Sequence, residues 1–218
     1  MLQDNKDTYK HKGLRNQLVQ EVAQKGITNK EVLKAIETVP RHLFMDNAFI
    51  SFAYKDQAFP IAAGQTISQP FTVAFQTELL HIQKGDKVLV VGTGSGYQTC
   101  VLAELGAKVF SIERQKILYE KAKLFLATLG YNAKLFYGDG YKGLPPFAPF
   151  DKILVTAGAP FIPEELIKQL KVGGILVIPV GDDSGQTMTT IVKTSADTFE
   201  KTELKKFHFV PLLGDKAW

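Results

Sequence analysis

A glycine-rich turn separates a short apolar run from a segment with helical composition. The apolar run 88–91 leads directly into Gly-Thr-Gly-Ser-Gly-Tyr at 92–97, and residues 98–105 have the composition of a helix. Glycines at such a place let the backbone turn tightly and let a ligand approach it closely. The helix that follows offers free backbone N–H groups in its first turn. These features predict a ligand-binding loop at the end of a strand.

Two acidic residues follow the next two apolar runs. Glu113 directly follows the run 107–112 and lies 21 positions after Gly92. Asp139 lies between two glycines after the run 134–137. A carboxylate at the second strand end can accept hydrogen bonds from both ribose hydroxyls of a nucleoside. An acid at the third strand end suits the edge of an adenine ring. From these residues alone, the alternative is a tight structural turn beside a solvated Glu113.

The spacing distinguishes between nucleoside cofactors. Tyr97 stands where a dinucleotide-binding GxGxxG pattern has its third glycine, and the loop carries no phosphate-binding lysine. A sugar and a base without a phosphate are the parts of S-adenosyl-L-methionine, which is therefore the predicted cofactor. The residues that we expect to contact it in this loop and at these strand ends are Gly92, Thr93, Gly94, Glu113, Asp139 and Gly140.

A parallel sheet is needed to bring these groups together. Its predicted strands are apolar without alternation, as strands covered on both faces are; they are 87–91, 109–112, 134–137, 153–156 and 175–180. Helices are expected between them, at 98–105, 115–129 and 163–170. This order predicts an α/β fold: a doubly wound, mostly parallel Rossmann-like methyltransferase sheet with helices on both faces. Partial alternation at 188–193 and 199–210 predicts antiparallel strands at one edge.

The chain is predicted to form a single methyltransferase domain over residues 1–218. Residues 1–80 would form an N-terminal helical cap and active-site segment, 81–180 the cofactor-binding α/β core, and 181–218 a C-terminal strand extension. Within the cap we expect helices at 15–25, 29–38 and 71–81, the first closed by Gly26 and the second with Asn29 as its N-cap.

Composition excludes several protein classes. With 45% hydrophobic and 22% charged residues, the chain is typical of a globular protein. Its single cysteine and four dispersed histidines predict neither a disulfide framework nor a metal site. The net charge of +4 comes from scattered lysines, which favours solvated side chains over a nucleic-acid surface. Without a secretory signal or a lipid-compatible segment, we expect a cytoplasmic protein with no membrane partner, as a monomer or weak homo-oligomer.

From about Val39 to its end, the chain resembles the protein-L-isoaspartate O-methyltransferase family, a class I methyltransferase family. The matching segments are 39–44, 53–56, 64–70, 77–80, 92–98, 111–114, 138–140, 148–151, 169–170 and 209–212. The Gln-Thr-Ile-Ser-Gln-Pro run at 65–70 and the late Val-Pro-Leu are specific to the family, whereas most class I methyltransferases share the glycine loop. Two positions depart from the pattern: Val90, where the family usually has an acid, and Leu213, where it often has threonine.

The resemblance implies a protein-repair enzyme. Such an enzyme methylates the free α-carboxylate of L-isoaspartyl residues in damaged proteins and peptides, and the ester then closes to a succinimide. In the family, the serine that corresponds to Ser68 is the active-site residue. The resemblance also assigns cofactor contacts to Gln65, Thr66, Ile67 and Ser68, and peptide contacts to Val210 and Leu212. Tyr54 and Asp56 are expected either to line the substrate cleft or to close a surface turn.

Other functions stay open from the sequence. The acceptor could be a small molecule or a nucleic acid, although many amino-group methyltransferases carry an Asn/Asp-Pro-Pro-Tyr loop where this chain has Thr-Ala-Gly-Ala at 156–159. The departures at Val90 and Leu213 leave room for a cofactor-binding regulator without catalysis. A serine hydrolase is disfavoured because the chain has no GxSxG motif.

Overall fold

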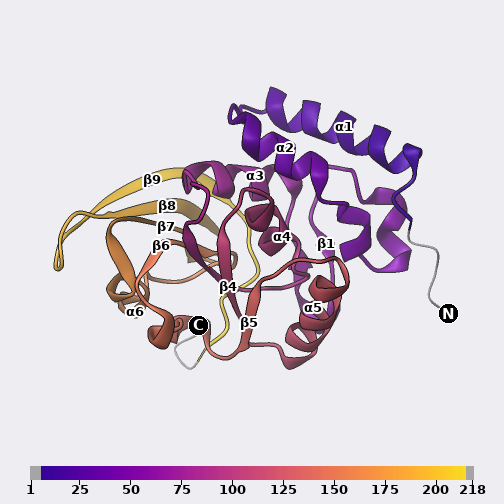
Figure 1. Cartoon of the computed structure of the whole chain (residues 1–218). Coiled ribbons are helices and arrows are strands. Elements are labelled where there is room, and N and C mark those ends of the chain that lie inside the picture. Colours follow the sequence, from indigo (N-terminus) through magenta and orange to yellow (C-terminus); the bar gives the residue numbers. More distant parts are fainter. Residues whose placement is uncertain (1–5, 215–218) are drawn as a thin grey trace.

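A seven-stranded sheet forms the centre of the computed structural model, which describes residues 6–214 (Figure 1). Its strands in spatial order are β5 (Lys134–Tyr137), β4 (Lys108–Glu113), β3 (Lys87–Val91), β6 (Phe150–Val155), β7 (Leu170–Asp182), β8 (Gly185–Lys193) and β9 (Phe199–Phe207). The first five pair in parallel, and β8 and β9 add to the edge as antiparallel strands. The predicted α/β methyltransferase fold with an antiparallel C-terminal edge is confirmed.

The strand order places a crevice at the end of β3. The chain runs from β3 to β4 and β5 on one side and then returns to β6 on the other side. Val91 at the end of β3 therefore lies between Ile112 on β4 and Val155 on β6. Loops that leave neighbouring parallel strands in opposite directions open a ligand-binding crevice. The glycine loop, Glu113 and Thr156 lie at the ends of β3, β4 and β6, beside this crevice.

The continuous apolar runs are explained by burial on both faces of the sheet. Leu89 and Val91 pack in one cluster with Leu166 of α6 (Glu164–Lys168). Val88 and Val90 point to the other face and pack with Leu102 of α4 (Tyr97–Glu104). The helix α5 (Lys116–Thr128) packs beside β4 and β5. Both faces are thus covered, as the lack of alternation predicted.

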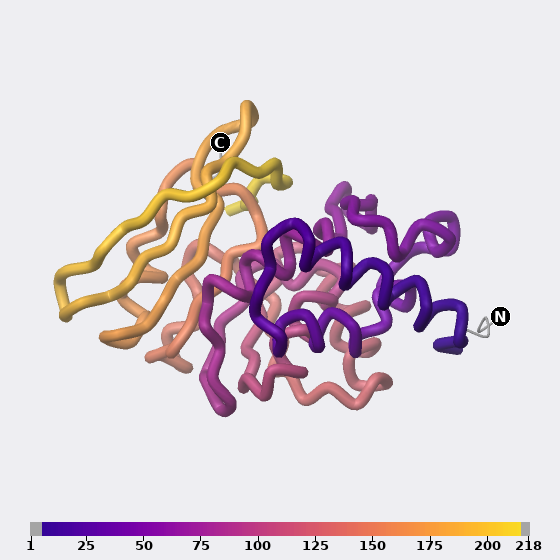
Figure 2. Tube along the Cα trace, turned by 90° about the horizontal axis from the view of Figure 1, so that it is seen from above, coloured from indigo at the N-terminus to yellow at the C-terminus, as the bar shows by residue number. Residues whose placement is uncertain are grey.

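The N-terminal part lies over the α4 side of the molecule, where Figure 2 shows its helices running side by side. It consists of α1 (Tyr9–Gln24), α2 (Lys30–Thr38) and α3 (Pro70–Leu79). Asn29 caps α2 as expected, since its side chain accepts hydrogen bonds from the first turn. The first helix begins six residues earlier than predicted, because Thr8 and His11 form a reciprocal capping box.

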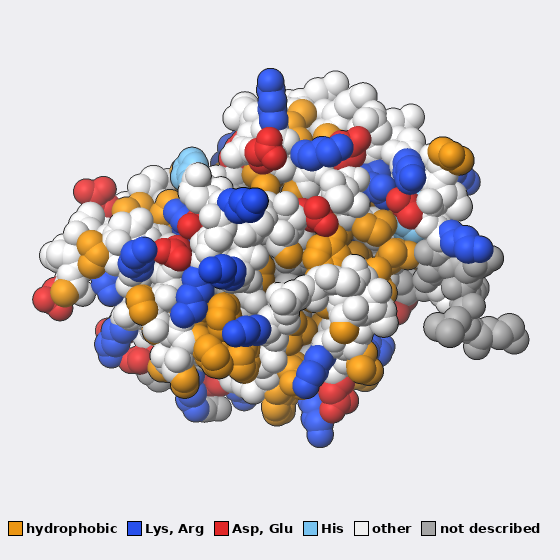
Figure 3. Space-filling model, viewed as in Figure 1, with side chains coloured by type: hydrophobic (Ala, Val, Ile, Leu, Met, Phe, Trp, Pro, Cys, Tyr) orange, Lys and Arg blue, Asp and Glu red, His pale blue; other side chains and the backbone are white. Residues whose placement is uncertain are grey.

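Short elements connect the larger ones. The two-stranded hairpin β1 (Phe59–Pro60) and β2 (Thr66–Ile67) precedes α3. The described part of the chain also contains five 3₁₀ turns: η1 (Arg41–Phe44), η2 (Asn47–Phe52), η3 (Ala62–Gly64), η4 (Gly140–Lys142) and η5 (Pro145–Phe147). Within residues 6–214, no helix is both long and apolar enough to cross a membrane. Cationic and acidic side chains are interspersed over the face seen in Figure 3.

Candidate active site

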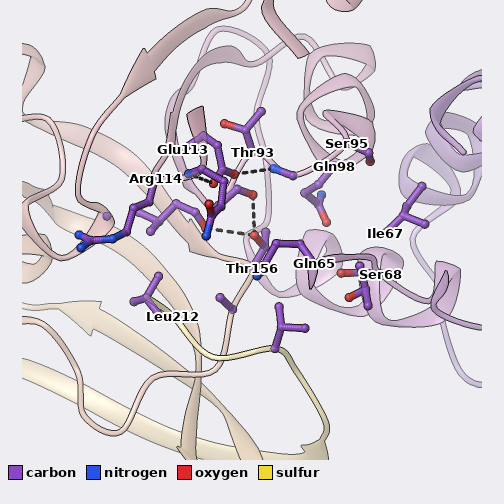
Figure 4. A pocket seen from close by; sticks show the side chains of 18 of the residues that line it. Gln65, Ile67, Ser68, Thr93, Ser95, Gln98, Glu113, Arg114, Thr156 and Leu212 are labelled. Atoms are coloured by element: carbon purple, nitrogen blue, oxygen red, sulfur yellow. Dashed lines mark hydrogen bonds between the residues drawn. The ribbon is translucent and has the colours of Figure 1, made fainter. Parts of the chain in front are cut away.

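A cavity opens at the carboxyl ends of β3, β4 and β6 (Figure 4). Four segments line it: the hairpin end at 65–68, the glycine loop at 91–98, the end of β4 at 112–115 and the C-terminal segment 210–213, together with Val73, Gly140, Thr156 and Ala157. The predicted site residues in this lining are Gln65, Thr66, Ile67, Ser68, Gly92, Thr93, Gly94, Glu113, Gly140, Val210 and Leu212. Segments far apart in the sequence thus meet where the sequence analysis expected a nucleoside.

The glycine loop requires glycine for steric reasons. Gly92 has a φ of +95°, and a Cβ on it would stand 2.5 Å from Thr156 Oγ1. That hydroxyl donates a hydrogen bond to the Gly92 carbonyl at 2.7 Å, so the two residues are in direct contact. Gly94 has a φ of +56°, a conformation that side chains rarely adopt. The loop backbone is therefore held close to the cavity without side chains in the way.

Glu113 is held in place by backbone donors. Its Oε2 accepts the Gly94 N–H at 2.9 Å, and its Oε1 accepts the Gln115 N–H at 2.8 Å. The residue is only 6% exposed, and its carboxylate lies at the cavity, as Figure 4 shows. Each carboxylate oxygen has a second lone pair that these bonds do not use. The group is therefore arranged to accept hydrogen bonds from two neighbouring hydroxyls.

Asp139 lies beside the cavity and not in its lining. Its Oδ1 accepts the Tyr141 N–H at 3.0 Å and so caps η4, and its Oδ2 is 3.6 Å from Arg114 Nη1. It faces a neighbouring pocket that Tyr141 and Phe161 also line. Gly140 does line the cavity, and a Cβ on it would stand 2.4 Å from Val91 Cγ1. Gly140 of this motif thus lies where a cofactor contact was predicted, whereas the Asp139 carboxylate caps η4 outside the lining, so its predicted contact is not supported by its position.

Ser68 keeps its hydroxyl available. Within the described chain no hydrogen bond to Ser68 Oγ is present, and the side chain lies at the cavity (Figure 4). A serine just before a helix often caps it. Here Asp56 takes that part, since its Oδ1 accepts the Phe71 N–H in the first turn of α3 at 2.7 Å. The hydroxyl of Ser68 is thus free to contact a ligand.

The structure places Tyr54 and Asp56 outside the cavity lining. The Tyr54 hydroxyl lies 3.0 Å from Arg15 Nη1 and 2.6 Å from His42 Nδ1. Asp56 pairs with Lys25 Nζ at 2.5 Å and accepts from Gln69 Nε2 at 2.9 Å. The expectation that they bind substrate is therefore not supported by their position. Their partners come from α1, its C-cap Lys25, η1 and the residue before α3, which the local sequence could not indicate.

Sequence reasoning missed Gln98, whose side chain also lines the cavity (Figure 4). Its Nε2 donates to Thr77 Oγ1 at 2.9 Å, and that hydroxyl donates its own proton to the Val73 carbonyl at 2.7 Å. This chain of donors fixes the orientation of the amide. Its Oε1 is then a buried acceptor without a protein partner. Buried polar atoms are rarely left unpaired, so this oxygen suits a donor group on a ligand.

The two departures from the family pattern have different surroundings. Val90 is fully buried in the apolar cluster on the α4 face of the sheet. Where the family usually has an acidic side chain, this chain therefore has an apolar one that packs in the core. Leu213 lines the cavity with an apolar side chain. The anionic group in the lining is accordingly Glu113.

Comparison with known proteins gives a consistent answer. The profile of the family described as Protein-L-isoaspartate(D-aspartate) O-methyltransferase (PCMT) matches residues 13–217. A protein-L-isoaspartate O-methyltransferase of Christiangramia forsetii is 65% identical over 97% of this chain and 99% of its own length. The Flavobacterium psychrophilum protein of that name is 63% identical over the same shares.

Solved structures agree in fold. A protein-L-isoaspartate O-methyltransferase superposes with a TM-score of 0.84 at 29% identity, over 92% of this chain and 66% of that chain. A Plasmodium falciparum protein of the same description, in complex with S-adenosyl-L-homocysteine, superposes with a TM-score of 0.80 at 26% identity, over 91% and 98% of the two chains.

Proposed function

We propose residue roles for a chain that belongs to the protein-L-isoaspartate(D-aspartate) O-methyltransferase family. Its activity is transfer of a methyl group from S-adenosyl-L-methionine to the free α-carboxylate of L-isoaspartyl residues in damaged proteins and peptides. The near full-length match to this one family favours that acceptor over a small molecule or a nucleic acid.

The cavity suits this cofactor. S-adenosyl-L-methionine supplies a methyl group activated by a positively charged sulfur. Glu113, held by two backbone N–H groups, would accept hydrogen bonds from the ribose hydroxyls. The unpaired Oε1 of Gln98 would accept from a donor such as the ammonium of the amino-acid part. The backbone at Gly92 and Gly94 would lie against the cofactor without side-chain interference.

The acceptor needs no general base. A carboxylate with a pKa near 4 is ionised at neutral pH and already carries its nucleophilic lone pairs. Among the described residues that line the cavity there is no histidine. The work of the protein is therefore to bring the carboxylate oxygen into line with the methyl group, which is catalysis by proximity and orientation.

Ser68 is the residue that we assign to hold the acceptor. Its Oγ would donate a hydrogen bond to the α-carboxylate and would not act as a nucleophile. The observation that carries this role is the hydroxyl itself, which lies at the cavity unpaired while Asp56 caps α3 in its place. Beside it, the backbone of Val210 and Leu212 is held by Gly158 at 2.9 and 2.7 Å, which would keep the peptide side of the cavity in place.

The test is Ser68→Ala with paired peptides that contain isoaspartate or aspartate. We expect kcat on the isoaspartyl peptide to fall about 10- to 100-fold, the cost of one lost hydrogen bond to a charged group. Affinity for S-adenosyl-L-homocysteine, measured by calorimetry, should change little. Ser95→Ala is the matched control, because Ser95 Oγ also lines the cavity but accepts the Tyr97 N–H. Full turnover by Ser68→Ala would exclude Ser68 from the mechanism.

The setting of the enzyme is also a proposal. We expect a single domain that works in the cytoplasm as a monomer or weak homo-oligomer, without nucleic-acid or membrane partners. The dispersed charges of Figure 3 and the buried Cys100, whose thiol pKa is raised by burial, support this setting. Light scattering at micromolar concentration tests the oligomeric state, and a stable tetramer would contradict it.

A further inference from the structure

Arg41 is a fully buried arginine next to the candidate active site. It begins η1 and has an exposed fraction of 0%. Its Nη2 donates to two backbone carbonyls, that of Gln57 at 2.9 Å and that of Ser68 at 3.0 Å. These carbonyls lie just before β1 and just after β2. One guanidinium nitrogen therefore joins the two ends of the hairpin that carries the Gln65–Ser68 wall of the cavity.

The charge of Arg41 has neutral partners. Within residues 6–214, no carboxylate lies within 4.0 Å of its guanidinium, which instead stands 5.7 Å from the centre of the Tyr97 ring and 6.0 Å from that of Phe59. Burial lowers its pKa to about 10, so it remains a cation at neutral pH. A buried cation without a paired anion is costly for folding. Stability alone is thus a poor explanation for an arginine here.

Ser68 lies between two anchors. Arg41 holds its carbonyl, and Asp56 holds the next residues through the Gln69 side chain at 2.9 Å and the Phe71 N–H at 2.7 Å. The two anchors leave the backbone of Ser68 little freedom, and within residues 6–214 its hydroxyl makes no hydrogen bond to protein. A misplacement of about 1 Å in a reacting group can cost about 100-fold in rate.

We infer that Arg41 is a positioning residue for methyl transfer: by holding the Ser68 carbonyl, its guanidinium orients the Ser68 hydroxyl toward the acceptor carboxylate. The inference rests on the role proposed for Ser68. It assigns to Arg41 no contact with substrate or cofactor, and it predicts that its effect on turnover depends on Ser68.

The experiment is a double-mutant cycle with Arg41→Lys and Ser68→Ala. Lysine keeps the charge, but its side chain is one bond shorter, so its Nζ does not reach the position from which Arg41 Nη2 donates to both carbonyls. We expect Arg41→Lys alone to lower kcat about 10- to 100-fold on an isoaspartyl peptide. In the Ser68→Ala background the same change should lower kcat less than about 3-fold, because coupled residues are not additive. Calorimetry with S-adenosyl-L-homocysteine and thermal unfolding accompany each variant.

Arg15→Lys is the matched control. Arg15 is also a buried arginine, 5% exposed, and it also donates to a backbone carbonyl, that of Glu37, but it lies outside the cavity lining. We expect it to lose thermal stability and to keep kcat within about 2-fold, since no active-site group depends on it. A second variant, Arg41→Met, removes the donor to the Ser68 carbonyl altogether, so it should lower kcat at least as much as Arg41→Lys and, in the Ser68→Ala background, less than about 3-fold, which a structural role alone would not give.

The outcomes separate the two proposals. Wild-type kcat in a folded Arg41→Lys enzyme would overturn the inference, and so would an equal loss in both backgrounds of the cycle. If Ser68→Ala lowers kcat while Arg41→Lys acts additively, only the positioning role fails. If Ser68→Ala keeps full turnover, the role of Ser68 fails and the positioning role fails with it.

Discussion

Two polar clusters of this molecule differ in how their hydrogen bonds are used. The first is the active-site cavity. The second is the amino-terminal cluster, which we define as Asp7, His11, Arg15, His42 and Tyr54. In that cluster Arg15 donates to both Asp7 oxygens at 3.0 and 2.9 Å and to the Tyr54 hydroxyl at 3.0 Å, and the hydroxyl contacts His42. Most polar groups there pair with one another, although His42 Nε2 is buried without a partner in the described part of the chain.

In the cavity the polar groups are held by the protein but left partly unpaired. Glu113 is held by two backbone N–H groups with lone pairs to spare, the Ser68 hydroxyl has no protein partner, and the Gln98 carbonyl oxygen is buried without a donor. Unsatisfied buried groups cost stability, so a fold retains them where a ligand completes the set. The cavity thus combines several unpaired polar groups around one space that a ligand can fill, whereas in the amino-terminal cluster the charged groups already pair with each other.

The amino-terminal cluster also resembles a metal site at first sight. Ligand atoms of Asp7, His11 and His42 all lie within 4.8 Å of one another. However, Arg15 already pairs with the Asp7 carboxylate, and the two imidazole rings lie against each other with centres 3.9 Å apart and planes tilted by 32°. The Nδ1 atoms of both histidines are also engaged, His11 with the Thr8 N–H and His42 with the Tyr54 hydroxyl. This geometry favours a role in docking α1.

The strongest test of the comparison is Glu113→Ala. Loss of a charged acceptor should weaken binding of S-adenosyl-L-homocysteine by about 3 kcal/mol, or about 100-fold. Calorimetry measures this effect. The control is Asp7→Asn, which also removes a carboxylate charge but in the amino-terminal cluster, and which should leave the affinity unchanged. Equal losses in the two variants would erase the distinction between the clusters.

The second test removes the centre of the amino-terminal cluster. Arg15→Met should lower the free energy of unfolding by about 2 to 3 kcal/mol, because it leaves Asp7, Tyr54 and the Glu37 carbonyl without their donor. Urea denaturation measures this loss. Cofactor affinity of the folded variant should stay within about 2-fold of the wild type. A large loss of affinity at unchanged stability would show that the cluster belongs to the active site.

The third test uses pH. Burial, and then the nearby charge of His11, lowers the pKa of His42 from 6.5 to about 4. Between these values the unfolded chain binds the proton more readily, so stability falls as the pH drops from 6.5 toward 4. From pH 7 to pH 5 we expect a loss of about 1 to 2 kcal/mol, with a ceiling of about 1.4 kcal/mol per pH unit.

The control variant for the pH test is His42→Gln, which should flatten the dependence in this range. Arg15 lowers the pKa of Asp7 below 3.8 by a hydrogen bond, so that carboxylate contributes only at lower pH. A steep loss that persists in His42→Gln would assign the effect to another group.

The sequence predicted those parts of the site that are defined by local geometry. The glycine loop and Glu113 were found because a strand, a tight turn and an acid at the next strand end have fixed spacing along the chain. Arg41, Gln98 and Thr156 were missed as site residues because their parts depend on partners 16 to 65 positions away. Tyr54 was expected near the substrate for the same reason. The sequence shows only a polar aromatic residue near the family's motif, whereas the direction of its side chain depends on contact with Arg15 of α1.

The smallest effect, and the sharpest test of that reassignment, is Tyr54→Phe. The change removes one hydroxyl that contacts both Arg15 and His42 and leaves the ring in place. We expect a loss of about 1 kcal/mol in unfolding free energy, the usual value of such a hydrogen bond. The KM for an isoaspartyl peptide should be unchanged, because Tyr54 does not line the cavity. Steady-state kinetics and urea denaturation measure the two quantities. A raised KM at wild-type stability would show that Tyr54 contacts the substrate and that the amino-terminal cluster is part of the active site.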